Sequence, residues 1–188
     1  MQPMRGARGP ILGAVLAGGQ SRRFGSDKAL AVLDGQTLID HAVAGLSPHV
    51  AGVVLCGRAG GLADRPLAGL GPLGGLNAAL HHARDQGFCG VLTTGCDMPC
   101  YPQALPAALI GEEAAVLAGQ PLLGWWPADL ADRLDAHLAQ DGDRSIRGWI
   151  ARIAARTVER PGLLPPNINR PEELDQLAAR FRETRRPS

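Results

Sequence analysis

Residues 11–28 read ILGAVLAGGQSRRFGSDK, an apolar run followed by a loop rich in glycine and basic residues. The run at 11–17 is short, continuous and apolar, which predicts a buried β-strand. Gly18 and Gly19 end the run and predict a tight turn, because glycine adopts backbone conformations that other residues avoid. Ligands of open parallel sheets bind outside the carboxyl ends of the strands, so the loop after this strand is a candidate binding site.

Strand-like runs alternate with helix-like runs along the rest of the chain. Strands are predicted at 50–56, 89–94, 113–118, 121–126 and 156–159. Helices are predicted at 38–46, 73–86, 128–139, 145–155 and 171–182. The stretch 102–112 is compressed in length, so only a short helix is expected there. Continuous apolar strands that alternate with helices predict a three-layer α/β fold, with a mostly parallel central sheet between two layers of helices.

The composition is that of a single globular domain. The chain has 188 residues, of which 45% are hydrophobic, and this length can bury a sizeable core. The 19 basic and 18 acidic residues leave a net charge of +1, which gives no reason to expect a broad nucleic-acid or membrane surface. We therefore expect one domain over 1–188, with a flexible leader at 1–10 and a flexible tail at 183–188.

Targeting and redox signals favour the cytoplasm. No apolar window reaches about 18 residues, so no membrane span is predicted. The apolar run at 11–17 is short and lacks the cleavage-site context of a signal peptide. The four cysteines have no CxxC spacing, and Cys96 and Cys100 have no histidine nearby. This usage favours a reduced compartment and disfavours a zinc site.

Lys28 is the only lysine of the chain, beside 18 arginines. One interpretation is a coding bias that left a single lysine by chance. The other is that this position needs a compact ammonium group, which a planar guanidinium cannot replace.

The loop at 18–28 carries the groups that a triphosphate needs. Its glycines let backbone N–H groups approach phosphate oxygens closely, and Ser21, two arginines and Lys28 add donors and positive charge. The loop is not a P-loop, which needs Gly-Lys-Ser/Thr in succession, and it is not the GxGxxG dinucleotide fingerprint. A tight turn with solvated arginines is the alternative interpretation, and so dense a cluster disfavours it.

The same stretch resembles the LAGGxSxRxGxDK signature of the nucleotidyltransferase superfamily that activates sugars, terpenoid precursors and the molybdenum cofactor. The resemblance implies a Rossmann-like nucleotidyltransferase fold in which this loop wraps a nucleoside triphosphate. It implies catalytic roles at the phosphates for Arg23 and Lys28, and Asp27 also matches the signature. The other matching residues, implied to bind the nucleotide, are Leu16, Ala17, Gly18, Gly19, Ser21 and Gly25.

Asp97 follows the strand predicted at 89–94, in the sequence Cys96-Asp97-Met98-Pro99. Taken alone, a carboxylate at a strand end fits a Mg²⁺ ligand about as well as it fits a turn cap. The segment resembles the CDxP motif of the same superfamily, which implies that Asp97 binds Mg²⁺ and takes part in catalysis. Cys96 is then expected to be a packing residue without a nucleophilic role.

Further segments resemble the molybdenum cofactor guanylyltransferases in particular. Asp64, followed by Gly-Pro-Leu-Gly-Gly-Leu at 71–76, resembles their D…GPLxGL element and implies that Asp64 lies near the nucleoside. The segments 120–123 and 143–147 resemble their QPL and basic-turn segments. The order and spacing of these segments carry the resemblance from the first strand to the last helix.

The segment 167–174 reads NINRPEEL and resembles the NxNTPEEL of these enzymes, with arginine in place of threonine. The resemblance implies that Asn167 and Asn169, with Arg144 or Arg147, face the pterin, since amide groups match pterin edges. A plain turn before the last helix explains the asparagines equally well.

The resemblance implies the reaction GTP + molybdenum-molybdopterin → molybdopterin guanine dinucleotide + pyrophosphate, with Mg²⁺ as the cofactor. The implied partners are GTP and molybdenum-molybdopterin, with molybdoenzyme chaperones or other molybdopterin-handling proteins as further candidates. Neither nucleic acid nor a membrane is expected as a partner.

Two alternatives stay open at this point. The strand at 50–56 ends in Cys56-Gly57-Arg58, whereas the enzymes that the chain resembles often have an asparagine in this turn that helps to hold the nucleotide, so Arg58 is expected at that position. A related nucleotidyltransferase that uses CTP or ATP, on molybdopterin or another phosphorylated acceptor, is therefore one alternative. The other is a non-catalytic nucleotide-binding partner that delivers cofactor, and the presence of both Lys28 and Asp97 argues against it.

Overall fold

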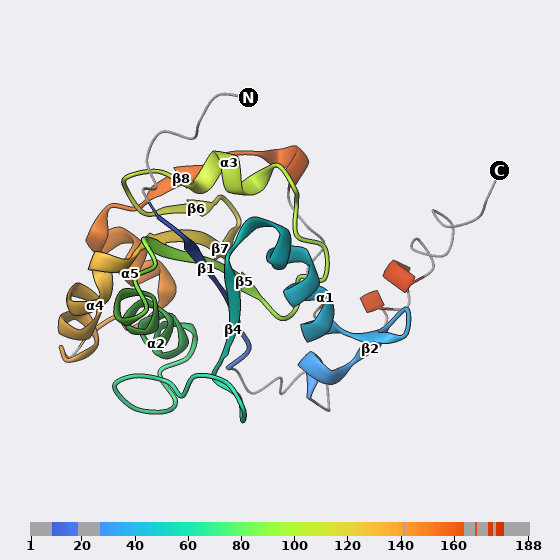
Figure 1. The fold of residues 1–188 in the computed structure, drawn as a ribbon, viewed down its shortest axis with the longest axis horizontal. Helices are drawn as coiled ribbons and strands as arrows, with labels where there is room; N and C mark the ends of the chain where they lie inside the picture. Colours follow the sequence, from blue (N-terminus) through green and yellow to red (C-terminus); the bar gives the residue numbers. More distant parts are fainter. Residues whose placement is uncertain are drawn as a thin grey trace.

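The computed structural model describes residues 9–18, 27–140, 142–163, 168, 173–174 and 176–178. Six strands of this part form one sheet in the order β4-β1-β5-β7-β6-β8 (Figure 1). Their bounds in that order are Gly52–Cys56, Ile11–Leu16, Gly90–Gly95, Gln120–Pro127, Ala115–Leu117 and Arg156–Val158. β7 runs antiparallel to β5 and β6, and the other pairings are parallel, so the predicted mostly parallel sheet is confirmed.

The reversed direction of β7 follows from a short turn. Ala118 and Gly119 alone connect β6 to β7, and so short a connection permits only an antiparallel pair. Gly119 has a φ of +79°, in the left-handed region that favours glycine. The chain then crosses over through α4 (Ala131–Leu138) and α5 (Ile146–Ile153), which is why β8 can return parallel to β6.

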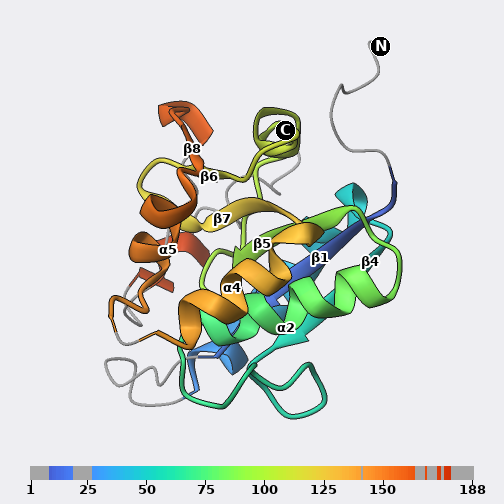
Figure 2. The same cartoon turned by 90° about the vertical axis from the view of Figure 1, so that its left-hand side faces the viewer.

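Helices cover both faces of the sheet, as predicted. α2 (Pro72–Asp85), α4 and α5 pack on one face, the face turned to the viewer in Figure 2. α1 (Leu38–Leu46) and α3 (Leu105–Leu109) pack on the other face, and α3 is as short as the compressed sequence indicated. Trp126 belongs to the first core and Trp125 to the second, and both are buried. Both tryptophans are therefore core residues on opposite faces of β7.

Local sequence signals set the helix ends. Thr37 caps α1 in a capping box with Asp40, and Pro72 occupies the first position of α2, where proline is favoured. Ser145 caps α5 through its hydroxyl group. The predicted helix 128–139 is divided into a 3-10 turn, η3 (Ala128–Leu130), and α4.

A small third hydrophobic cluster lies beside the main sheet. β2 (Val32–Leu33) and β3 (Gln36–Thr37) form a hairpin that contributes to it. The N–H of Ile168 donates to the backbone carbonyl of Asp97 at 3.1 Å, which ties this cluster to the turn after β5. The buried members of the cluster are Leu33, Leu38, Ile168 and Leu177.

The ends of the chain are described only in part. Within the predicted helix 171–182, residues 173–174 and 176–178 are helical, and the others lie outside the described residues. The predicted leader is described at residues 9–10 only, and the predicted tail lies outside as well. None of the helices in the described ranges combines the length and the apolar character that a membrane-crossing segment needs.

Candidate nucleotide site

The candidate site lies at the edge of the sheet where β4, β1 and β5 end. Leu16 at the end of β1 pairs with Cys56 of β4 and with Gly95 of β5. Leu16 and Ala17 are buried, and the N–H of Ala17 donates to the carbonyl of Cys56 at 3.1 Å. The three loops that hold the predicted site residues therefore leave the sheet side by side, at the edge where parallel sheets bind ligands.

Lys28 and Asp97 form an ion pair at this edge, although 69 positions separate them in the sequence. Nζ of Lys28 donates to Oδ2 of Asp97 at 3.3 Å. Lys28 is 7% exposed, whereas the Asp97 side chain is 23% exposed. A buried ammonium group acts on a nearby anion more strongly than an exposed one, because less water screens it. The structure thus brings together the residues expected to serve the phosphates and the metal.

The turn that carries Lys28 is anchored on both sides. Asp27 caps the 3-10 helix η1 (Lys28–Leu30), and its Oδ1 accepts a hydrogen bond from the N–H of Ala29 at 3.2 Å. Ala29 is buried in the core beside α1. These two anchors limit the positions that the Lys28 ammonium group can reach.

Gly95 makes room for the Asp97 carboxylate. A Cβ at residue 95 would lie 2.6 Å from Oδ1 of Asp97 and 3.0 Å from Cε of Met98. The N–H of Met98 donates to the carbonyl of Gly95 at 3.3 Å and closes the turn. A larger residue before the Cys-Asp pair would therefore displace the carboxylate.

Cys96 lies beside the ion pair as a neutral thiol. Burial raises its pKa to about 11, and the charge of Asp97 adds to the rise, against smaller opposing effects of Lys28 and Arg58. A thiol with this pKa stays protonated at neutral pH, and the thiolate is the nucleophilic form. The environment of Cys96 thus agrees with the packing role expected from the sequence.

Asp64 reaches the same edge from the loop after β4. This loop folds back on its strand, because the N–H of Gly57 donates to Leu62 at 3.0 Å and the N–H of Leu62 donates to Leu55 at 2.8 Å. Oδ1 of Asp64 is buried and has no hydrogen-bond partner among the described residues. A Cβ at Gly18 would lie 3.9 Å from that oxygen, so the start of the glycine-rich loop is its neighbour. A buried acceptor without a donor is costly, and a bound ligand can supply the donor.

Glycines at the start of α2 let the helix approach Asp64. A Cβ at Gly74 would lie 3.0 Å from Cβ and Cγ of Asp64, and a Cβ at Gly75 would lie 3.0 Å from Cβ of Cys56. The N–H of Arg65 donates to the carbonyl of Gly74 at 3.1 Å. The Gly-Pro-Leu-Gly-Gly pattern is thus explained by close packing of the helix start against the loop after β4.

The remaining predicted residues fall into two groups. Arg144 donates to the backbone carbonyl of Gln140 at 3.2 and 3.3 Å, and Arg147 lies exposed in the first turn of α5, so their pterin-side role stays a prediction. The predicted residues that lie outside the described part of the chain are Gly19, Ser21, Arg23, Gly25, Asn167 and Asn169.

Arg58 has a partner that the sequence did not indicate. Its position in place of a nucleotide-binding asparagine stays a prediction, and in the structure its guanidinium group pairs with the Asp27 carboxylate. The available signal was its position two residues after the end of β4, at the same sheet edge as the loop that ends in Asp27. Which acidic residue it would meet depended on the tertiary structure.

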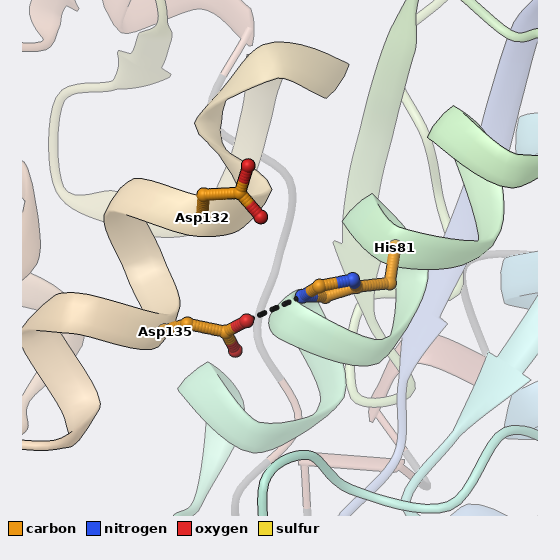
Figure 3. A group of neighbouring side chains, drawn as sticks. All are labelled: His81, Asp132 and Asp135. Atoms are coloured by element: carbon orange, nitrogen blue, oxygen red, sulfur yellow. Dashed lines mark hydrogen bonds and ion pairs between the residues drawn. The ribbon is translucent and has the colours of Figure 1, made fainter.

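One group in the described part of the chain, His81, Asp132 and Asp135, places its ligand atoms within 4.8 Å of one another, as a metal site requires (Figure 3). It joins the third turn of α2 to α4, away from the strand ends. Nε2 of His81 lies 2.8 Å from Oδ2 of Asp135, and Arg84 lies within hydrogen-bond distance of both His81 and Asp132. Arg84 and Asn77 already donate to the ligand atoms of this cluster, and it lies away from the strand ends where ligands bind, so we assign it to the packing of α2 against α4.

Curated relatives match the chain over most of their length. A molybdenum cofactor guanylyltransferase from Sinorhizobium fredii is 39% identical, over 86% of this chain and 88% of the relative. A molybdenum cofactor guanylyltransferase from Rhodobacter capsulatus is 35% identical, over 92% of this chain and 97% of the relative.

Solved structures share the fold. A protein from Archaeoglobus fulgidus, described as molybdopterin-guanine dinucleotide biosynthesis protein A, has a TM-score of 0.67 at 20% identity and covers 92% of this chain and 99% of its own. A Mycobacterium tuberculosis protein in complex with manganese has a TM-score of 0.59 at 18% identity, and it covers 90% of this chain and 98% of its own.

Residues 13–157 match the family described as the MobA-like NTP transferase domain. The chain therefore belongs to the MobA-like NTP transferase family, and it is a nucleotidyltransferase related to the molybdenum cofactor guanylyltransferases.

Proposed function

We propose that this chain transfers GMP from GTP to the terminal phosphate of molybdenum-molybdopterin, forming molybdopterin guanine dinucleotide and pyrophosphate. The observation that carries the proposal is the Lys28–Asp97 pair, 3.3 Å apart, at the same sheet edge as Oδ1 of Asp64, a buried acceptor with no donor among the described residues. One side of the edge thus offers charge for phosphates and a metal, and the other offers an acceptor for a nucleoside. The relatives named molybdenum cofactor guanylyltransferase support the choice of both substrates.

The chemistry is an in-line displacement at the α-phosphate of GTP. An oxygen of the pterin phosphate bonds to the α-phosphorus, the bond from that phosphorus to the bridging oxygen breaks, and pyrophosphate leaves. The attacking phosphate is already an anion, so no side chain has to remove a proton. The barrier consists mainly of positioning and of repulsion between anions, which cationic groups relieve.

The residues of this chain divide that work. Lys28 stabilises the charge that develops on the α-phosphate and the leaving pyrophosphate. Arg23 and the backbone of Gly18 and Gly19 hold the β- and γ-phosphates, with Ser21 and Gly25 in the same loop. Leu16 and Ala17 form the apolar floor beneath, and Asp64 accepts a hydrogen bond from the nucleoside.

The surroundings of Asp97 fit a Mg²⁺ ion. Mg²⁺ takes one or two protein carboxylates and fills its octahedron with phosphate oxygens and water. Asp97 is one carboxylate, and its 23% exposure leaves it accessible to both of these. When bound, the ion neutralises charge on the triphosphate and on the leaving pyrophosphate. The manganese complex of a structurally similar protein supports a divalent metal in this fold.

The pterin side of the site is assigned to the segment around Ile168 and to the start of α5. Ile168 lies between the two predicted asparagines in the sequence and donates to the Asp97 carbonyl, which supports a pterin-binding role for Asn167 and Asn169 beside the metal. Arg144 or Arg147 would supply positive charge for the pterin phosphate. We further propose that the protein acts in the cytoplasm and hands its product to molybdoenzyme chaperones or other molybdopterin-handling proteins.

A pyrophosphate-release assay with molybdenum-molybdopterin as the acceptor tests the proposal. GTP, CTP and ATP are compared, each with and without Mg²⁺. We expect release with GTP and Mg²⁺ only, and none when the acceptor is omitted. Release with CTP or ATP would establish the alternative nucleotide, and nucleotide binding without any release would indicate a non-catalytic carrier. Thermal shifts with each nucleotide distinguish binding from turnover, because selective binding raises the Tm.

A further inference from the structure

Arg58 and Asp27 form a bidentate ion pair at the edge of the candidate site. Nη1 of Arg58 donates to Oδ1 of Asp27 at 2.9 Å, and Nη2 donates to Oδ2 at 2.5 Å. One planar guanidinium group therefore holds both carboxylate oxygens, the geometry in which Arg–carboxylate pairs are strongest. In agreement, the hydrogen bonds from Arg58 lower the pKa of the Asp27 carboxyl below its ordinary value.

Asp27 transmits this constraint to Lys28. It directly precedes Lys28, and its Oδ1 also accepts the N–H of Ala29, so the Asp27 side chain spans the residue that carries the ammonium group. Lys28 in turn reaches Oδ2 of Asp97 at 3.3 Å. A shift of the Asp27 side chain would turn the start of η1 and move the ammonium group away from Asp97.

The turn that carries Arg58 is itself held in place. Gly57 has a φ of +76°, and a Cβ there would lie 2.5 Å from Cα of Gly18. Gly57 therefore packs directly against Gly18, two residues after the end of β1, while its neighbour Arg58 holds Asp27. Since Gly18 and Asp27 are the described residues on either side of the stretch 19–26, one turn contacts both flanks of the glycine-rich loop.

We propose that Arg58 is a positioning residue: by holding Asp27 through two hydrogen bonds, it fixes the Lys28 ammonium group beside Asp97. This inference rests on the nucleotidyl transfer proposed above. Arginine suits the role because a lysine cannot offer two parallel donors to one carboxylate. The Arg58 side chain is 21% exposed and that of Asp27 is 47% exposed, so water screens the pair and limits its contribution to stability even in the bidentate geometry. Loss of Arg58 therefore affects turnover far more than the Tm.

The single lysine makes the position of Lys28 directly measurable. An N-hydroxysuccinimide acetate reagent modifies Lys28 and the α-amino group, and peptide mass spectrometry resolves the two products. The α-amino group is the internal reference, and the full chain is used without nucleotide. Arg58→Ala and Arg58→Lys should each raise the rate of Lys28 acetylation several-fold over the reference. Asp27→Asn, which keeps an N-cap acceptor and loses the charge, should do the same.

Turnover supplies the second readout. Arg58→Ala should lower kcat about 10-fold and change the KM for GTP less than kcat, because a displaced catalytic group costs rate more than ground-state binding. The double variant Arg58→Ala/Asp27→Asn should be no slower than the slower single variant, since both changes break one interaction. Arg84→Ala is the matched control: it removes an arginine pair with Asp132, at 2.7 Å, and should leave Lys28 acetylation and kcat unchanged.

Unchanged acetylation of Lys28 in both Arg58→Ala and Asp27→Asn would overturn the proposal. The proposal would also be overturned if the fold-losses in kcat of the two single variants multiplied in the double variant and the KM for GTP rose. Arg58 would then bind the nucleotide directly. The acetylation assay needs no substrate. Altered acetylation in a protein that releases no pyrophosphate from GTP would refute the proposed function and would still support the placement of Lys28 by Arg58.

Discussion

Lys28→Met is the substitution that most directly tests the proposed chemistry. Methionine keeps an unbranched side chain in the buried space that Lys28 occupies at 7% exposure, and it removes the charge. The Asp97 carboxylate that loses its partner is 23% exposed, so water can solvate it. We therefore expect the fold to remain and the change in rate to report the ammonium group.

The expected magnitude follows from the observed contact. Two unit charges at the 3.3 Å separation of Nζ and Oδ2 interact by about 5 kcal/mol at an effective dielectric constant of about 20. A phosphate oxygen at the same separation that gains about half a charge in the transition state is stabilised by about 2.5 kcal/mol, which corresponds to roughly 10²-fold in rate. Removal of one preorganised donor typically costs about 10²–10³-fold, which agrees with this value.

The assay is the release of pyrophosphate from saturating GTP, with Tm measured on the same samples. Lys28→Met should lower kcat by about 10²-fold with little change in Tm. Lys28→Arg keeps the charge and loses the compact shape, so its kcat should lie between those of wild type and Lys28→Met. Turnover of Lys28→Met at the wild-type rate would refute the catalytic role. A large fall in Tm that accompanies the loss of rate would indicate a structural role instead.

Three further substitutions test the rest of the site. Asp97→Asn should abolish the dependence of the rate on Mg²⁺ in a metal titration at fixed GTP. An unchanged titration curve would indicate that residues other than Asp97 bind the metal. Asp64→Asn should raise the KM for GTP about 10-fold while keeping or raising the Tm, because it removes the charge from a carboxylate whose buried Oδ1 has no donor in the described part of the chain. A normal KM with a lowered Tm would contradict the nucleoside contact. Gly57→Ala should lower the free energy of unfolding by about 2–4 kcal/mol in urea titrations, because its Cβ would meet Cα of Gly18 at 2.5 Å and the φ is positive. A variant as stable as wild type would show that the turn can shift at no cost.

Several site residues could be predicted from the sequence because their motifs are local. Lys28, Asp64 and Asp97 each follow a strand, and residues after parallel strands gather at one sheet edge. The pairing of Arg58 with Asp27 could not be predicted, since two loops that meet in space carry no mutual signal in their sequences. The same holds for His81 on α2 and its partners on α4, which meet only because both helices cover one face of the sheet.

The sequence by itself determined the class of fold and most of the helices and strands, but not the hairpin of β2 and β3. Apolar runs, the Thr37 cap and the proline at the start of α2 act through local backbone chemistry, so they could be recognised without the fold. The tertiary structure decided which charges meet: Lys28 with Asp97 at 3.3 Å, and Arg58 with Asp27. These contacts depend on how closely neighbouring loops approach, and the approach here depends on the absence of side chains at positions such as Gly57, where one would collide with Gly18.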